Sequence, residues 1–377
     1  MTDQVPAVAP GRAVEEPWLS ALVGGPDTAG PFTVGGARVL LGPAGTAVVV
    51  EAGDVPSRSG VWNAVEVRLL GPAPAPVTER LLGAPWGTDA RALPVHVAVR
   101  TGAELLYLGT ARVSRGGTAD GVLTDCALLL ATPLGRDLLD RVRPPLPPVG
   151  LPGLGWLGHV DGDRAKALEE FLTGWYPAVP AAPRAPGPPA TGSAVPLPDG
   201  LRQLHRLARH RPAVLGGQNR ILPPPEVHTD ALGEMLVFGV ENQGGFFWSL
   251  LWTLDGPEAD PTVWFREPGE PPVAEQEPLS GFLLQFSLFE ASMTADYLAL
   301  PRRLTADRAE QLTRALHPVP LRPFWPWVPT RFYVAPGLVV QVGTEDGEEF
   351  EVWAGASHRG ALAPLAGLAV DWRRFDG

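Results

Sequence analysis

The chain has 377 residues, 45% of them hydrophobic, and a formal net charge of −11, which is enough material for two domains with cores of their own. No stretch approaches the roughly 18 apolar residues that a membrane helix needs, and the N-terminus MTDQVPAVAPGR lacks the features of a signal peptide. The single cysteine, Cys126, cannot form an intrachain disulfide, so we expect a cytoplasmic protein with no membrane partner.

The charge is uneven along the chain. Up to Gly150 there are 12 basic and 14 acidic residues, whereas 18 basic and 27 acidic residues follow. A nucleic-acid-binding protein normally presents a basic face. The acidic excess therefore argues against nucleic acid and is compatible with a basic protein partner.

The N-terminal part is expected to be a β-rich domain. Residues 1–30 resemble a loosely attached leader, apart from the apolar Trp18, Leu19 and Leu22. Short apolar runs then predict strands at 38–41, 46–51, 61–70, 94–100, 105–110 and 122–130. With a short closing helix near residues 134–142, residues 31–143 predict a small barrel or an open sheet.

A linker region is predicted at residues 144–196, because proline-rich stretches occupy both of its ends. Apolar residues at helical spacing between these stretches predict one helix over 161–175. Asp161 or Asp163 would be its N-cap.

Residues 197–377 predict an α+β domain, because strands and helices occur without regular βαβ alternation. The predicted elements are a helix at 197–207, a strand at 234–240, a glycine-bearing turn at 242–245, a strand at 246–254, a helix with an apolar stripe at 279–293, a helix at 305–316, a hairpin of 331–342 with 348–354, and a helix at 361–368.

Signatures of catalysis and of cofactor binding are weak. The seven histidines form neither an H-E-x-x-H motif nor a Cys/His cluster, so we predict no metal and no cofactor. Residues 153–158 match G-x-G-x-x-G, but a proline-rich segment precedes them and the bulky Trp156 lies inside. A dinucleotide site needs a strand before these glycines, so we interpret the match as a turn.

Carboxylates gather in two segments. Seven lie between Asp255 and Glu277, where Arg266 is the only basic residue, and five more lie at 345–351. Each segment is either a solvated loop or an acidic rim that steers a cationic partner. Glu241 and Glu290 differ, because each interrupts an apolar run. We expect capping, pairing or a groove there, and a structural hydrogen bond for Glu290.

Three segments resemble the SUKH superfamily, which includes bacterial immunity proteins and a yeast regulator of cell-wall synthesis. They are Leu197-Pro198 opening the helix LRQLHRLA, the string GVENQGGFFW, and the helix EPLSGFLLQFSLFEA. The resemblance covers about 197–372, departs from the family pattern at 318–329, and does not extend to the N-terminal domain. It implies a SUKH-like mixed sheet with flanking helices and a non-enzymatic protein-binding module, such as an immunity protein that neutralises a toxin.

The resemblance also implies a binding face. Its residues would be Glu241, Asn242, Gln243, Phe247 and Trp248, with Asp260 and Trp264 at the rim. In the competing interpretation Asn242 and Gly244 only shape the turn and Trp248 belongs to the core.

The expected partner is a basic protein, for example a nuclease toxin. One alternative is a regulatory or scaffold protein whose N-terminal β-domain binds a small ligand or nucleic acid. Another is an enzyme that uses carboxylates and His358.

Overall fold

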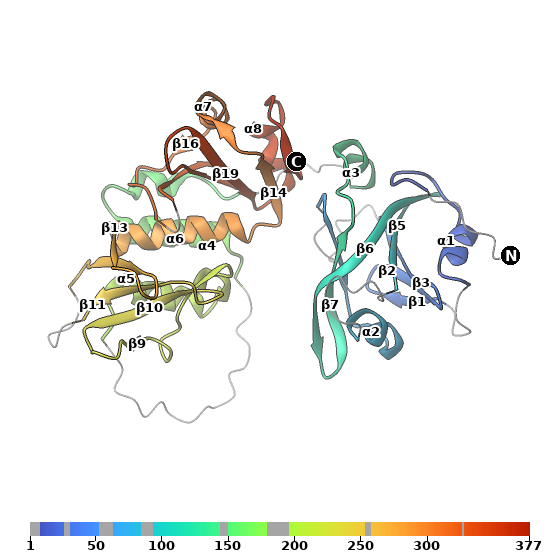
Figure 1. Cartoon of the computed structure of the whole chain (residues 1–377), viewed down its shortest axis with the longest axis horizontal. Coiled ribbons are helices and arrows are strands. Elements are labelled where there is room, and N and C mark those ends of the chain that lie inside the picture. The colour runs from blue at the N-terminus through green and yellow to red at the C-terminus, as the bar shows by residue number, and fades with distance from the viewer. Residues whose placement is uncertain are drawn as a thin grey trace. The chain divides into compact units, whose positions relative to one another are not determined.

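The computed structural model describes residues 8–25, 31–52, 63–83, 93–143, 150–178, 196–252, 258–325 and 328–377 (Figure 1). The chain divides into two compact units, one formed by residues 1–146 with Asp376 and the other by residues 147–375 with Gly377. Both units combine strands and helices, so the fold is mixed α+β. The predicted linker stretches 144–149 and 179–195 lie outside the described residues. Within the described residues no helix is both long and apolar enough to cross a membrane.

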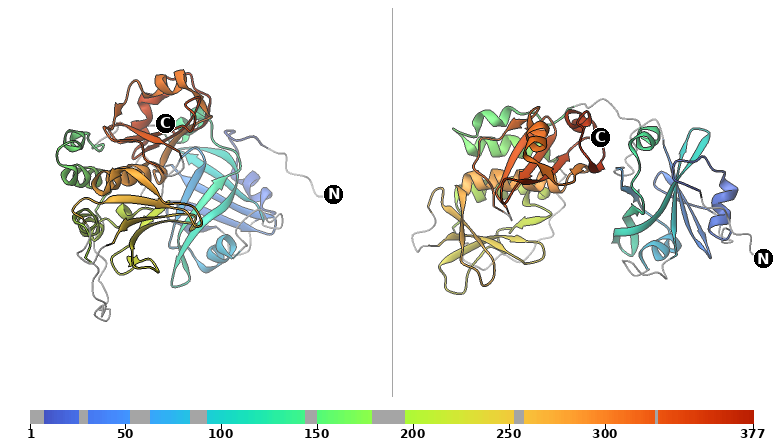
Figure 2. Two further views of the ribbon diagram at one scale, coloured as in Figure 1. Left: turned by 60° about the vertical axis from the view of Figure 1, so that its left-hand side comes forward. Right: turned by 45° about the horizontal axis from the view of Figure 1, so that its top comes forward.

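The first unit is built on a curled seven-stranded sheet with strand order β1-β2-β3-β5-β6-β7-β4 (Figure 2). The strands are β1 (Phe32–Val34), β2 (Ala37–Gly42), β3 (Gly45–Glu51), β4 (Glu66–Leu70), β5 (Val95–Thr101), β6 (Glu104–Ala119) and β7 (Val122–Leu130). All neighbouring strands are antiparallel except β3 and β5. The six predicted strands are present, and β4 begins later than predicted.

Three helices pack on this sheet. α2 (Ala75–Leu82) and α3 (Arg136–Val142) contribute to the main core on one face. α1 (Glu16–Leu22) packs on alternate residues of the same strands through Leu19, which is 0% exposed. Successive residues of a strand point to opposite faces, so α1 covers the other face. The leader was expected to be loosely attached apart from Trp18, Leu19 and Leu22, and these three residues do pack on the sheet as part of α1.

The second unit contains two antiparallel sheets. One has the order β13-β12-β11-β10-β8, with β9 paired to β10, and the other has the order β16-β17-β18-β19-β14-β20, with β15 paired to β19. The strands of the first are β8 (Asn219–Ile221), β9 (His228–Thr229), β10 (Met235–Glu241), β11 (Phe247–Leu251), β12 (Thr262–Arg266) and β13 (Val273–Pro278). Those of the second are β14 (Tyr297–Pro301), β15 (Leu304–Thr305), β16 (His317–Pro318), β17 (Thr330–Ala335), β18 (Leu338–Gly343), β19 (Glu349–Ala356) and β20 (Trp372–Phe375).

Helix α6 (Leu279–Met293) lies between these two sheets (Figure 1). It buries 13 of its 15 residues, because β12 and β13 contact it from one sheet and β18 and β19 from the other. The predicted helix is thus present, but it is covered on several sides and not only along one apolar stripe.

The other helices of this unit are α4 (Arg164–Trp175), α5 (Asp199–Ala208), α7 (Ala306–Thr313) and α8 (Ala363–Ala366). The side chain of Asp163 caps α4 by accepting a hydrogen bond from the Lys166 amide at 3.0 Å. Leu168 and Phe171 of α4 are buried in the core around α6. The helix predicted within the linker region therefore belongs to the second unit.

Three further expectations need correction. Residues 331–342 form two strands, because the chain reverses at Gly337 with φ +70°. β12 and β13 were not predicted and occupy the acidic segment before α6. Gly155–His159 of the G-x-G-x-x-G match form a 3-10 helix in which Trp156 is 3% exposed, and the described element directly before it is the helix α3, not a strand.

Candidate functional site

Trp248 belongs to the core. Its ring centroid lies 5.4 Å from that of Phe282 and 6.0 Å from that of Phe286, both on α6. The side chain is 0% exposed, and its indole Nε1 donates to Glu275 at 3.0 Å. The expectation that Trp248 lines a binding face is therefore corrected, because no part of it reaches the surface.

The neighbours of Trp248 point the other way, since side chains alternate along a strand. Phe247 on β11 is paired in register with Arg266 on β12, and Ser249 with Trp264. We call this side of the sheet, away from α6, the open face; its accessible residues are Val240, Phe247, Leu251, Trp264 and Arg266, whereas Ser249 on the same side is fully buried. Phe247 and Trp264 are half-buried, whereas Leu251 is 56% exposed. Two predicted residues thus come together on one surface.

The turn at one end of the open face is shaped by Glu241. Glu241 is 8% exposed, and its Oε2 accepts hydrogen bonds from the amides of Gln243 at 2.7 Å and Gly245 at 3.1 Å. Gly244 adopts φ +78°, a conformation that glycine tolerates well. Asn242 and Gln243 are exposed at this turn. Glu241 therefore holds the turn, and the two amide residues present their side chains to solvent.

Asp260 has a structural role that the sequence did not indicate. Its Oδ1 accepts from the Ser280 amide and its Oδ2 from the Ser280 hydroxyl, both at 2.7 Å. Ser280 is in the first turn of α6, where amides lack partners within the helix. Asp260 thus caps α6 from another segment, so its carboxylate has a structural role and not the predicted role at the rim of the binding face.

The acidic segment before α6 contains two kinds of carboxylate. Glu275 and Glu277 are each 5% exposed. Burial raises the pKa of Glu275 to about 7, although hydrogen bonds from Trp248 and from the Trp325 amide oppose the shift. Glu277 pairs with Arg164 at 2.8 Å. These two carboxylates are structural and belong neither to a solvated loop nor to a rim.

Four other carboxylates around this sheet are accessible to solvent and have no ion-pair partner among the described residues: Glu234, Glu258, Glu267 and Glu270. Arg266 is already engaged, because it lies 3.9 Å from Asp230 and 5.8 Å from the centre of the Phe247 ring. The open face is therefore a partly apolar surface whose unpaired charges in the described part of the sheet are negative. Asp255 of the predicted rim lies outside the described residues.

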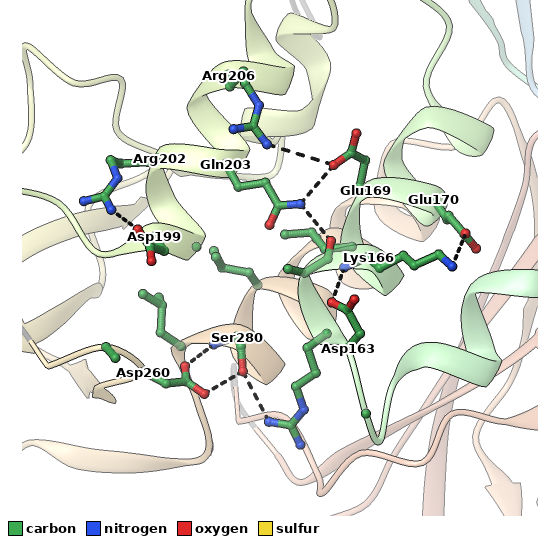
Figure 3. A pocket seen from close by; sticks show the side chains of 18 of the residues that line it. Asp163, Lys166, Glu169, Glu170, Asp199, Arg202, Gln203, Arg206, Asp260 and Ser280 are labelled. Atoms are coloured by element: carbon green, nitrogen blue, oxygen red, sulfur yellow. Dashed lines mark hydrogen bonds and ion pairs between the residues drawn. The ribbon is translucent and has the colours of Figure 1, made fainter.

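A separate groove of about 1100 Å³ lies between α4, α5 and the start of α6 (Figure 3). Three of its basic side chains are paired within it: Lys166 lies 3.9 Å from Glu170, Arg206 lies 4.0 Å from Glu169, and Arg202 pairs with Asp199. Gln203 Nε2 donates to the Ala165 carbonyl at 2.7 Å. These contacts tie α4 to α5, so we interpret the groove as the edge of a helix interface.

The expectation for Glu290 is confirmed. Its carboxylate accepts hydrogen bonds from the amides of Gly217, Gln218 and Asn219 at 2.7–2.8 Å. The carboxylates at 345–351 are exposed: Arg303 pairs with Glu349 and Glu351, and Asp346 accepts from the amides of Glu348 and Glu349.

No group of His, Cys, Asp and Glu suited to hold a metal ion occurs in the described part of the chain. His358 accepts a hydrogen bond from the Gly360 amide at the start of a 3-10 turn. Compared with family models, characterised proteins and solved structures, the chain matches none of them.

Proposed function

We propose that the second unit is a non-enzymatic protein-binding module that docks a basic protein on its open face. One observation carries the proposal: Phe247, Trp264 and Leu251 share a solvent-accessible surface, and the unpaired charges around it are carboxylates. Protein interfaces combine aromatic anchors with a polar rim. Complementary charge mainly speeds association and selects the partner.

The specific function proposed is that of an immunity protein. This step rests on the resemblance of residues 197–372 to the SUKH superfamily. A nuclease toxin must present cationic side chains to its polyanionic substrate. An acidic inhibitor surface with aromatic anchors would occlude such a cleft.

The test uses the full chain as bait in lysate of the native cell. One variant carries Glu267→Lys and Glu270→Lys in the turn between β12 and β13. The matched control carries Glu345→Lys and Glu348→Lys, two exposed carboxylates in the turn between β18 and β19. Both variants change the net charge by the same amount. A difference between them therefore reports the position of the carboxylates and not the overall charge of the protein.

A basic protein retained by the wild type and by the control, but lost by the first variant, supports the open face. That protein is then purified and assayed as a nuclease with increasing amounts of the wild-type chain. Stoichiometric loss of nuclease activity supports the immunity function. The proposed face is contradicted if both variants lose the protein equally. It is also contradicted if the wild-type chain retains no basic protein.

A further inference from the structure

A second cavity of the second unit is distinct from both the open face and the groove in Figure 3. It has a volume of about 560 Å³, within the range of about 300–1,000 Å³ typical of small-molecule sites. Its walls come from the start of β8, the end of β10, the last turns of α6 and strands β18 and β19. Phe289, Met293 and Trp353 supply apolar surface.

Asn219 lines this cavity with a side-chain amide that no described residue satisfies. The residue is only 2% exposed, and its one hydrogen bond to a side chain runs from its backbone amide to Glu290. Its side-chain nitrogen and oxygen are not among the fully buried unpaired atoms of the described residues, so they are open to the cavity. Because Glu290 also binds the amides of Gly217 and Gln218, the Asn219 backbone is fixed while its amide group stays available to a ligand.

Two further residues of the cavity lining, Glu241 and Gln341, have acceptor atoms with no partner among the described residues. Asn219 is paired in register with Glu241 across β8 and β10, and directly opposite residues of two strands project to the same side. The turn uses only Oε2 of Glu241. Gln341 donates through Nε2 to the Phe289 carbonyl and to Ser292 Oγ, which leaves its Oε1 as an acceptor. Two acceptors and one amide are thus available in the cavity, whose polar lining also includes Gln218, Thr330 and Glu351.

Three arginines also line the cavity: Arg302, Arg303 and Arg373. Arg302 pairs with Asp371 at 3.0 Å, and Arg303 pairs with Glu349 and Glu351. These ion pairs are exposed to water, so each contributes little stability and can be exchanged for an anion. Arg373 is exposed and has no partner among the described residues. Guanidinium groups bind phosphate in a bidentate manner.

We propose that this cavity binds a nucleoside phosphate. The ring would lie against Phe289 and Trp353 and donate hydrogen bonds to Glu241 and Gln341. The Asn219 side-chain amide would hydrogen-bond to the edge of the ring. The phosphate would bind to the guanidinium groups of Arg373 and Arg303. This activity goes beyond the protein docking proposed above and uses different residues, apart from Glu241.

Binding is tested by calorimetry on the full chain, with GMP, AMP, guanosine and inorganic phosphate as separate probes. We expect saturable binding of at least one nucleotide. Asn219→Ala breaks no side-chain hydrogen bond in the described structure and should weaken binding about tenfold. Arg373→Ala should also weaken it about tenfold, whereas Arg331→Ala, an exposed arginine of the same sheet, should leave it unchanged.

The proposal is overturned if neither nucleotide binds in the millimolar range, or if Asn219→Ala and Arg373→Ala bind as well as Arg331→Ala. Inorganic phosphate binding as tightly as the nucleotide overturns ring recognition. Guanosine binding as tightly as GMP overturns the role of the arginines. Circular dichroism of each variant confirms that the fold is retained before affinities are compared.

Discussion

Glu275 gives the second unit a pH dependence of its own. Burial raises its pKa from the ordinary 4.5 to about 7. Between these values the folded chain keeps a proton that the unfolded chain has lost, so stability falls as the pH rises. At about 1.4 kcal/mol for each pKa unit, the loss between pH 4.5 and 8 is about 3 kcal/mol.

The Glu275→Gln variant cannot titrate at this position and should not show that loss. We expect its free energy of unfolding, measured with urea from pH 5 to pH 8, to gain about 2.5 kcal/mol relative to the wild type as the pH rises. Glu258→Gln, at an exposed position, serves as the control. A constant difference between Glu275→Gln and the wild type across this range would show that Glu275 does not carry the effect.

The same residue shows why part of the site could not be predicted from sequence. Its partners, Trp248 and the Trp325 amide, are 27 and 50 positions away, so only the folded sheet reveals them. In FFWSLL every residue is compatible with burial, and alternation alone does not tell which side faces α6. The sequence therefore predicted that Phe247 and Trp248 matter but assigned both to one face.

At the scale of elements, the packing of α6 leaves no room for a side chain at Gly281. A Cβ added there would lie 2.7 Å from Glu277 Oε2 and 2.8 Å from Glu277 Cβ, beside the ion pair with Arg164. Replacing a helical glycine with alanine usually stabilises a protein by up to about 1 kcal/mol. Here we expect Gly281→Ala to destabilise the protein by about 1–3 kcal/mol, because the overlap forces the packing apart.

Gly174 in α4 is the matched control, since the nearest atom to its added Cβ is 3.9 Å away. Gly174→Ala should therefore be neutral or stabilising. Urea denaturation of both variants measures the two effects, and a stabilising Gly281→Ala would contradict the proposed overlap.

Elements with strong local signals were predicted well. The strand, turn, strand and helix from 234 to 293 match β10, β11 and α6 in order and type. β12 and β13 were missed because prolines and carboxylates surround short strands, and a sequence pattern cannot show that Glu275 and Glu277 are buried. The boundary between β17 and β18 was missed because apolar residues continue on both sides of Pro336-Gly337.

At the scale of the whole molecule, the two units have separate hydrophobic cores. Leu128 lies in the core of the first unit and Leu288 in that of the second, each 0% exposed. Replacing either with alanine should cost about 2–5 kcal/mol. We expect the loss of hydrogen-exchange protection to stay within the unit that carries the substitution, because neither core depends on the other.

Mass spectrometry of amide exchange in the full chain measures this separation. Leu128→Ala should speed exchange in the strands of the first unit and leave α6 protected, and Leu288→Ala should do the reverse. If either substitution speeds exchange in both units to the same extent, the chain unfolds as a single cooperative body.

The position of α6 between two sheets has a consequence for biosynthesis. One sheet that covers α6 is formed by residues 219–278, which are translated before the helix, whereas β18 and β19 are translated after it. Until residue 338 has left the ribosome, neither of these strands covers its side of a helix with 13 buried residues. Nascent chains that expose apolar surface tend to aggregate and to recruit chaperones. Chains that terminate between residues 293 and 338 would therefore expose the apolar side of α6 that β18 and β19 bury in the full-length chain.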